Sequence, residues 1–505
     1  SAFLRRREAS LLIGILSALA SWWVWAAIDP LPLVEDEVSY VLQSRIFASG
    51  HWTALSPPLP EFFQQAHVLT TPAVASKYAP GHALLMSIGT FFGAPALVPL
   101  LLSGLTGALL FALARRVANE WIALLAWLIW ISDPLNLRFR AAYYSEVTSD
   151  AMWFLAWWAL LEWRKTRERR WLLALAAAIG WGAITRPLTM LAFAVPVGVV
   201  VIRDVARLKK WTDLGFATAL GTLMLCIIPL WSAHTTGNWR VTPLALYTRD
   251  YLPFDKIGFG VDTTPPAKTL LPVDRFTYAG FYGEHVKHTV ARLPRTALDR
   301  LSAIATEEWS GPRLTLVPFV ALGLWGMTTE VGFALACSIA LFVFYLAYGH
   351  WSEWTLYYFE AMPVFALITA MGIWKAATRV RAANVVWLST VAAALLALLA
   401  GYELHDARWK RQRMAAWDVG FYNLIDKLPV HAAVIFVHYE PRLGPHANIV
   451  ANSPHLVTDP VWIVNDLGAR NAELMKYAGG RIPLALYEDA VRIEVDRTLL
   501  PGTPR

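Results

Sequence analysis

The sequence contains few cysteines and few charged residues. Only two of its 505 residues are cysteine, Cys226 and Cys337, and both lie inside apolar runs. A disulfide framework and a cysteine-based metal site are therefore excluded. Charged residues make up 16% of the chain and hydrophobic residues 56%, whereas a soluble domain carries about 25% charged residues. The chain lacks the polar surface that a water-exposed body needs, so it is a membrane protein.

Motifs of several soluble enzyme classes are also missing. The sequence has no Gly-rich phosphate loop, no HExxH and no GxSxG, which argues against nucleotide-driven and hydrolytic chemistry. The formal charge of +7 is not accompanied by the interleaved basic and aromatic residues of a nucleic-acid groove. We attribute the basic excess to membrane topology and to contact with anionic lipids.

Long apolar stretches predict the main architecture. Stretches near the ~20 residues that cross a bilayer recur along the chain. They predict eleven spans at 11–28, 95–114, 120–132, 147–163, 171–185, 188–202, 212–233, 313–327, 331–349, 356–374 and 384–402. The fold class is therefore an all-α polytopic membrane protein. The first span is too long for the apolar part of a signal peptide, so we interpret it as an uncleaved anchor.

The distribution of Lys and Arg predicts the orientation. If the N-terminus is cytoplasmic, the short loops on that side hold 17 Lys and Arg in 43 residues. The first loop on the opposite side, 29–82, holds only Arg45 and Lys77. Because basic loops resist translocation, we expect a cytoplasmic N-terminus and, with eleven spans, a C-terminus on the outer side.

Three outer segments are too polar to span the bilayer. In 29–82, apolar residues at helical spacing end at Gly50 and predict a short helix lying on the membrane. The segment 234–312 is rich in Pro, Gly and Tyr, has a helical stretch around 286–305 and could form a lid. In 403–505, strand-like runs alternate with a helix-like stretch at 468–478, which predicts a small α/β domain after a transmembrane domain of residues 1–402.

The most informative residues for chemistry are Glu35, Asp36 and Glu37, just past the first predicted span. Carboxylates beside an apolar wall tend to have a raised proton affinity, which suits a general base near neutral pH. The alternative is that these acids occupy the first turn of a surface helix, where its positive end favours them.

Basic residues near the outer ends of predicted spans are candidate phosphate contacts. Lys77 precedes an apolar run and can meet a phosphate as a point charge, or its stem can simply snorkel. His82, in the same stretch, more often caps or packs than catalyses. Arg186 lies between two apolar runs and can bond two phosphate oxygens or anchor at the interface. Arg138 belongs to an outer cluster in which pairing with an acid such as Glu146 is the plainer explanation.

The aromatic segment His350 to Glu360 joins two late spans. Its aromatic side chains could stack on a sugar or line a lipid groove, although an aromatic belt at the interface is the default interpretation. Glu360 differs from that pattern because it lies inside an apolar stretch. A carboxyl at that depth is costly enough to be a functional candidate.

These motifs resemble the GT-C superfamily of integral membrane glycosyltransferases, in particular the protein O-mannosyltransferase and aminoarabinose transferase group. Asp36-Glu37-Val38-Ser39-Tyr40 is similar to the acidic DE-x-x-Y setting of that group, and Ser49-Gly50-His51-Trp52 to its SGDW. Lys77-Tyr78-Ala79-Pro80-Gly81 is similar to its KPPL stretch, and Tyr357 to Pro363 corresponds loosely to its late Y-x-x-P element. The layout of about residues 1–400 follows the superfamily.

The resemblance implies an enzyme of the bacterial inner membrane. It would move a sugar from a polyprenyl-phosphate donor to a lipid, glycan or protein acceptor at the periplasmic face, with inversion and without an obligatory metal, although the acidic triplet could bind a divalent cation. It implies Asp36 as the catalytic base, with Glu37 shaping the site. The predicted substrate-binding residues are Glu35, Lys77, Tyr78, His82, Arg138, Arg186, Tyr357 and Glu360.

Two alternatives remain open at this point. A transporter or flippase of a lipid-linked sugar would often show paired repeats and broken helices at mid-membrane, and neither is evident in the sequence. A non-catalytic scaffold on the outer face is compatible with the same residues.

Overall fold

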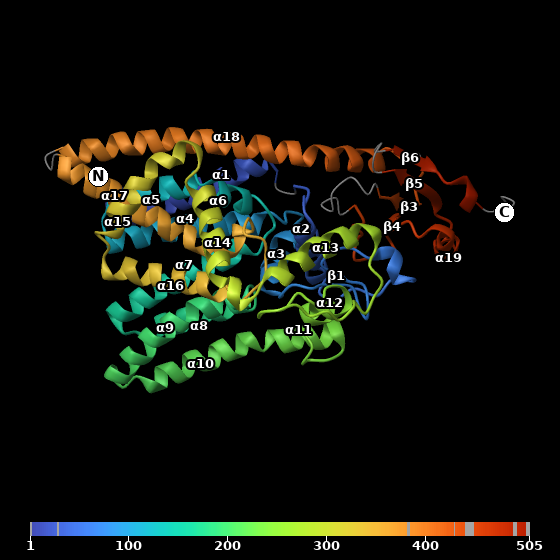
Figure 1. The fold of residues 1–505 in the computed structure, drawn as a ribbon, viewed down its shortest axis with the longest axis horizontal. Coiled ribbons are helices and arrows are strands. Elements are labelled where there is room, and N and C mark those ends of the chain that lie inside the picture. Colours follow the sequence, from blue (N-terminus) through green and yellow to red (C-terminus); the bar gives the residue numbers. More distant parts are fainter. Residues whose placement is uncertain are drawn as a thin grey trace.

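A computed structural model describes residues 3–27, 30–380, 384–428, 430–439, 449–487 and 492–500. The molecule is elongated (Figure 1): a helical bundle forms one end, connecting segments the middle, and a β-sheet the other end. The helix α18 runs along one side of all three regions.

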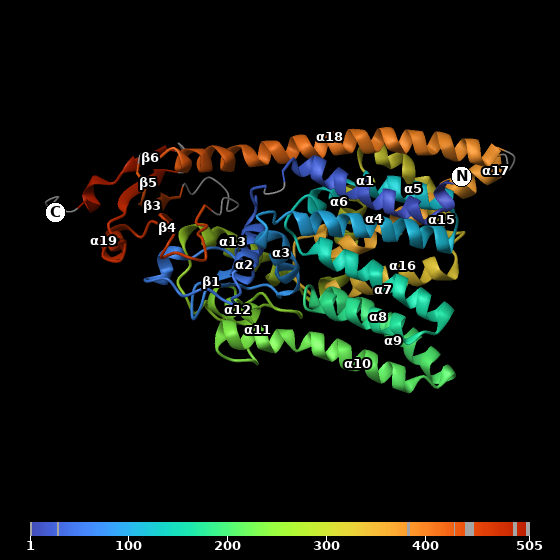
Figure 2. The ribbon, with the colours of Figure 1, turned by 180° about the vertical axis from the view of Figure 1, so that it is seen from behind.

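The bundle is built from helices of very different length. Its members are α1 (Arg7–Trp25), α3 (Gly81–Phe91), α4 (Leu97–Val117), α5 (Glu120–Ile131), α6 (Pro134–Arg140), α7 (Glu146–Thr166), α8 (Arg169–Ala183), α9 (Pro187–Leu208), α10 (Trp211–Leu225), α11 (Ile227–Thr236), α15 (Val317–Leu324), α16 (Thr329–Tyr345), α17 (Met362–Val380) and α18 (Val385–Asp426). The view from behind (Figure 2) shows α1 and α4 side by side, with α10 at the far edge. Gly14 and Gly104 permit this close packing, because a Cβ on Gly104 would lie 2.9 Å from the Gly14 carbonyl oxygen.

The predicted count of eleven spans is not confirmed. Among the described residues, six helices are long and apolar enough to cross a membrane, or up to eight if each of two bent pairs is one span. The short run at 120–132 forms the 12-residue α5, which bends by 70° into α6 instead of crossing alone. The runs at 313–327 and 331–349 likewise form one pair bent by 118°.

The first two outer segments form short helices and strands that pack against other elements of the protein. The first contains α2 (Glu35–Ala48), β1 (Val68–Leu69) and β2 (Ala75–Ser76), and the second contains α12 (Pro243–Tyr251), α13 (Pro272–Lys287) and α14 (Leu293–Glu308). The helix predicted before Gly50 is therefore present as α2. Nine of its 14 residues are buried against neighbouring elements, so the helix is packed into the protein, and its position at the membrane surface stays a prediction.

The C-terminal sheet contains the three predicted apolar runs as strands. Its strands are β3 (Ala433–His438), β4 (Val461–Asn465), β5 (Ile482–Tyr487) and β6 (Arg492–Val495), in the order β4-β3-β5-β6. The first three are parallel and β6 is antiparallel. The helix α19 (Asn471–Met475) lies between β4 and β5 in the chain. The expected boundary at residues 402–403 falls inside α18, which continues without a break to Asp426.

Short 3-10 helices complete the connections. They are η1 (Phe3–Arg5), η2 (Pro60–Phe63), η3 (Val290–Arg292), η4 (Gly311–Leu316), η5 (Thr355–Ala361), η7 (Gly468–Arg470) and η9 (Arg497–Leu499). One of them ties the first outer segment to the sheet: Phe62 and Phe63 of η2 pack in one apolar cluster with Phe436 and Trp462. The other face of the sheet is covered by the end of α18 through Phe421.

Candidate active site

Asp36, in the first turn of α2, lies where several loop segments meet. Its Oδ1 accepts a hydrogen bond from the Tyr78 phenol, and its Oδ2 lies 3.7 Å from Nε2 of His67, with 33% of the side chain exposed. The carboxylate is thus held on one oxygen and reachable from solvent. We call Asp36, His67, Lys77 and Tyr78 the Asp36 cluster.

Tyr78 is fixed as the donor in this contact. Its ring stacks on Tyr40, with 4.8 Å between the centroids. Burial raises the pKa of the Tyr78 phenol well above its ordinary value, and the charge of Asp36 raises it further. The phenol therefore stays protonated and donates to Asp36 at neutral pH.

Lys77 brings a buried cation next to these groups. Its side chain lies against the rings of Tyr78 and Tyr247, with Nζ 5.1 Å and 4.9 Å from the two centroids. Burial lowers the pKa of Lys77, while Asp255, Asp36 and Glu35 oppose that change. Among the described residues, no carboxylate oxygen lies within ion-pair distance of the ammonium group. Lys77 thus remains free to meet an added anion.

Glu37 points away from this site and holds the surrounding chain. Its carboxylate is 1% exposed and accepts hydrogen bonds from the backbone N–H groups of Leu33 and Tyr143. Arg411 of α18 lies 3.7 Å away. Burial raises the pKa of Glu37, whereas Arg411 and the two backbone donors oppose the rise. These contacts suit the predicted shaping of the site, and they leave the carboxylate no path to a substrate.

Glu35 completes a group with the donor set of a cation site. Glu35, Asp36 and His67 each offer one ligand atom, and these atoms all lie within 4.8 Å of one another. Two carboxylates and one imidazole are ligands that several divalent cations accept. The independence from a metal that we expect from the resemblance therefore stays a prediction.

His82 does not belong to the site. Its side chain is fully buried. Its Nδ1 lies 2.8 Å from the Thr148 hydroxyl and its Nε2 3.0 Å from the Tyr143 carbonyl oxygen. Because both ring nitrogens are engaged inside the protein, the structure gives no support to His82 as a substrate-binding residue.

Arg186, Tyr357 and Glu360 are brought together in a second, closed cluster. The guanidinium of Arg186 pairs with Glu146, lies 3.7 Å from Glu360 and 5.8 Å above the Tyr357 ring. Glu360 is fully buried and also accepts a hydrogen bond from the Ser149 hydroxyl. We call Glu146, Arg186, Tyr357 and Glu360 the Arg186 cluster. Its cation already faces two carboxylates, so the structure gives no support to Arg186 as a phosphate contact.

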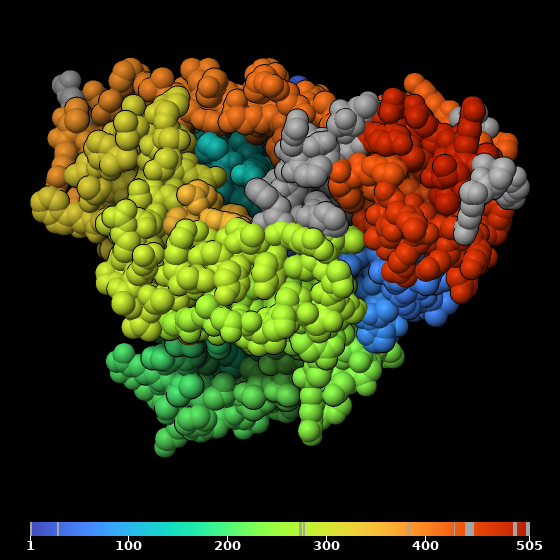
Figure 3. All heavy atoms as spheres, turned by 45° about the vertical axis from the view of Figure 1, so that its right-hand side comes forward, coloured from blue at the N-terminus to red at the C-terminus, as the bar shows by residue number. Residues whose placement is uncertain are grey.

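Arg138 of α6, by contrast, is exposed. Burial raises the pKa of Tyr144 well above its ordinary value, Asp36, Glu37 and Glu146 raise it further, and Arg138 opposes the rise. Arg138 and Asp36 therefore both lie close enough to Tyr144 to act on it electrostatically. The space-filling view (Figure 3) shows a hollow beside the orange α18, with teal residues of the first half of the chain at its floor.

Two residues of the site were missed by the sequence analysis, His67 and Asp255. His67 has a positive φ of 63°, which its backbone contacts enforce: its N–H donates to the Tyr247 hydroxyl and its carbonyl accepts from the Lys77 N–H. Strained backbone of this kind gathers at functional sites. Burial and the charge of Lys77 together lower the pKa of His67 to about 3, although Asp36 opposes the decrease, so its ring is neutral. Both residues lie in long polar loops without a motif.

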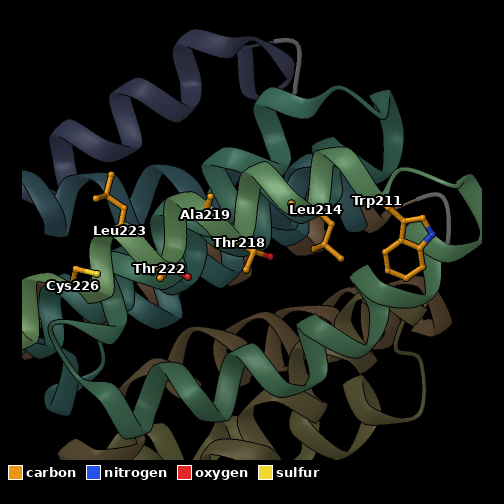
Figure 4. A pocket seen from close by; sticks show the side chains of 8 residues that line it. Trp211, Leu214, Thr218, Ala219, Thr222, Leu223 and Cys226 are labelled. Atoms are coloured by element: carbon orange, nitrogen blue, oxygen red, sulfur yellow. The ribbon is translucent and has the colours of Figure 1, made fainter.

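A groove far from this site runs along α10. Trp211, Thr218 and Cys226 lie on it (Figure 4), together with other apolar and small side chains of the same helix. No titratable cluster of the described residues borders it, so it is not a candidate active site.

Three comparisons with known proteins bear on this geometry. Residues 81–232 match the family model of dolichyl-phosphate-mannose-protein mannosyltransferases. This match leaves out Asp36 and Lys77. No match is found among curated protein sequences.

Solved structures of similar fold cover nearly the whole chain. The crystal structure of ArnT from Cupriavidus metallidurans bound to undecaprenyl phosphate has 16% identity and a TM-score of 0.52, covering 94% of this chain and 92% of that chain. The apo state of ArnT has 15% identity and a TM-score of 0.55 at the same coverage. The ArnT structures show that this chain has their fold, and the family match over residues 81–232 agrees with the resemblance to the GT-C superfamily.

Proposed function

We propose that this protein transfers a sugar from a polyprenyl-phosphate donor to an acceptor hydroxyl or amine at the outer membrane face, with inversion and with Asp36 as general base. The observation that carries the proposal is the position of Asp36: its carboxylate has one oxygen bonded to Tyr78 and is partly exposed, and the buried Lys77 lies nearby. The ArnT structure bound to undecaprenyl phosphate supports a lipid-phosphate donor, since this chain shares its fold.

The chemistry follows from the charges of the Asp36 cluster. The acceptor attacks the anomeric carbon and gives its proton to Asp36, while the bond from that carbon to the phosphate oxygen breaks. The lipid phosphate leaves with the electron pair and gains negative charge. Lys77 and Arg138 can stabilise that charge as fixed donors. Tyr78 orients the base, and a base so placed contributes about 10²–10⁴-fold to the rate.

The outer-face location rests on two observations. The short loops assigned to the cytoplasm carry the basic excess. The Asp36 cluster lies in segments at the end of the bundle that faces the sheet, away from the start of α1 (Figure 1). A cytoplasmic N-terminus therefore puts the base and the C-terminal sheet in the periplasm.

The test is transfer of a radiolabelled sugar from polyprenyl phosphate by purified protein in nanodiscs, with a crude periplasmic fraction as the acceptor source. Asp36→Asn should lower turnover by about 10²–10⁴-fold with an unchanged melting temperature. The matched control is Asp262→Asn, which removes an acid of the second outer segment that pairs with Lys256 and lies outside the Asp36 cluster. Full activity of Asp36→Asn refutes the assignment of the base. Movement of the labelled lipid across vesicles without transfer would identify a flippase instead.

The predicted independence from metal is tested in the same assay. Turnover should persist in EDTA, because Lys77 and Arg138 supply the positive charge that a metal would otherwise provide. Loss of turnover in EDTA and its recovery with Mn²⁺ or Mg²⁺ would assign a divalent cation to Glu35, Asp36 and His67.

A further inference from the structure

A small pocket lies where the first outer segment meets the C-terminal region. Its walls include Leu42 of α2 and Val68 of β1 on one side, and Pro454 and Leu456, between β3 and β4, on the other. The pocket has a volume of 30 Å³, which is room for about two water-sized groups. In Figure 3, the blue first outer segment and the orange and red C-terminal region meet on this side of the molecule. All residues that line the pocket fall within the described ranges.

The pocket contains a buried amide that lacks a partner. Gln65 lines the pocket and is 7% exposed. Its side-chain Nε2 has no hydrogen-bond partner among the described residues. Native proteins rarely leave a buried donor unpaired, so this N–H group is available for an acceptor atom that enters the pocket.

The lining of the pocket selects the kind of group that can enter. None of the described residues that line it is charged, so a phosphate, a carboxylate or an amine would have no counter-ion there. Most of the lining side chains are apolar, among them Leu42, Phe63 and Val68. A group that fits needs an uncharged acceptor oxygen for Gln65 and a small apolar part for the walls. An acetamido group offers both, as its carbonyl oxygen and its methyl group.

The pocket is close to the candidate active site along two elements. Gln65 and Val68 stand on either side of His67 in the chain. Leu42 follows Asp36 by six residues in α2, which is about 9 Å along the helix axis. A glycan whose acetamido group occupies the pocket therefore binds beside the segment that carries His67.

We propose that this pocket binds the acetamido group of an N-acetylated sugar in a glycan acceptor, with Gln65 as the hydrogen-bond donor. The role of the glycan as acceptor rests on the proposed glycosyl transfer. The binding itself can be measured without turnover.

The experiment compares two soluble glycans that differ in this group alone. Fully N-acetylated chitotriose has an acetamido group on each ring where cellotriose has a hydroxyl group, and the two share one backbone. Titrated onto full-length protein in nanodiscs, chitotriose should bind at least tenfold more tightly than cellotriose. The N-butyryl analogue of chitotriose should bind as weakly as cellotriose, because its longer acyl chain exceeds the volume of the pocket.

Variants of the pocket should abolish this preference. Gln65→Leu keeps a side chain of similar size and removes the N–H donor. Val74→Leu narrows the pocket at a partly exposed wall residue and leaves the amide in place. The matched control is Gln412→Leu, which changes an exposed glutamine of α18 and should bind both glycans like wild type. The melting temperature of each variant verifies that it is folded.

The outcomes separate this proposal from the assignment of the base. Asp36→Asn should lose transfer and keep the preference for chitotriose. If Asp36→Asn keeps transfer while Gln65→Leu loses the preference, the assignment of the base fails and the acetamido site stands. If the wild type binds neither glycan or both equally, or if Gln65→Leu and Val74→Leu keep the preference, the acetamido site is refuted.

Discussion

The Asp36 cluster and the Arg186 cluster contain similar residue types in opposite electrostatic states. Lys77 has no ion-pair partner among the described residues, and Asp36 has one oxygen engaged by a neutral phenol. In the Arg186 cluster, the guanidinium faces both Glu146 and Glu360. The Asp36 cluster can bind an anion at Lys77 and accept a proton at Asp36. In the Arg186 cluster, the charged groups already pair with one another.

This difference shows why a residue type and a position near the membrane surface do not identify a phosphate contact. An arginine whose charge is matched inside the protein must lose those partners before it can bind a ligand. Lys77 lies against two aromatic rings and has no carboxylate within ion-pair distance among the described residues, so it breaks no ion pair when it binds an anion. The two clusters should therefore respond differently to mutation. Variants of the Arg186 cluster should lose stability, whereas variants of the Asp36 cluster should change the kinetics.

Arg186→Ala should have the largest effect of these variants, a loss of stability. This change leaves Glu146 and Glu360 buried without their cation, and breaking a buried pair in this way costs about 3–5 kcal/mol. The melting temperature in nanodiscs and the yield of folded protein should fall sharply. The triple variant with Glu146→Gln and Glu360→Gln should recover much of the loss. A normal melting temperature combined with weak donor binding would instead make Arg186 a phosphate contact.

Lys77→Ala should have the next largest effect, a loss of donor binding together with a lower kcat, because Lys77 also stabilises the charge on the leaving phosphate. A hydrogen bond to a charged group contributes about 1.5–3 kcal/mol, so the donor KM should rise roughly 10–100-fold with little change in melting temperature. An unchanged donor KM would move the phosphate site away from Lys77, and Arg138→Ala would then be the next variant to measure.

Lys77→Arg tests the role of Lys77 through the pH dependence of donor binding. Burial lowers the pKa of Lys77 below its ordinary 10.5, so the ammonium group loses its proton, and the donor its partner, at a lower pH than for an exposed lysine. Because arginine stays charged, the alkaline decrease in donor affinity should move to higher pH in this variant. The same alkaline limb in both proteins would show that another group controls donor binding.

The sequence predicted the Asp36 cluster better than the Arg186 cluster, for physical reasons. Asp36, Lys77 and Tyr78 lie in short local motifs, and the α2 helix follows from its apolar spacing. The pairing of Arg186 with Glu146 and Glu360 joins residues from α7, the start of α9 and η5, and sequence spacing carries no information on such contacts. His67 and Asp255 were missed for the same reason.

Tyr78→Phe should have a smaller effect than Lys77→Ala and slow turnover roughly tenfold. This decrease corresponds to about 1.4 kcal/mol, which is near the lower limit for a hydrogen bond to a charged group. The phenol orients Asp36 but takes no part in proton transfer, because its pKa lies well above the ordinary value. The kcat should fall while the donor KM and the alkaline limb stay unchanged. A shift of that limb would assign a proton-transfer role to Tyr78.

Asn465→Ala should have the smallest effect on turnover. Asn465 lies in the C-terminal sheet and acts on the Asp36 cluster only through the segment between them. The variant loses the two hydrogen bonds that hold the backbone of Phe62 and Gln64, and hydrogen bonds of this kind contribute about 0.5–1.5 kcal/mol each. Because the segment continues to the strained His67, its release should lower kcat a few-fold without changing donor KM. Asn452→Ala is the matched control: its amide bonds only Ile463 of the sheet itself. Equal kcat values in the two variants would mean that the sheet does not position the residues beside Asp36.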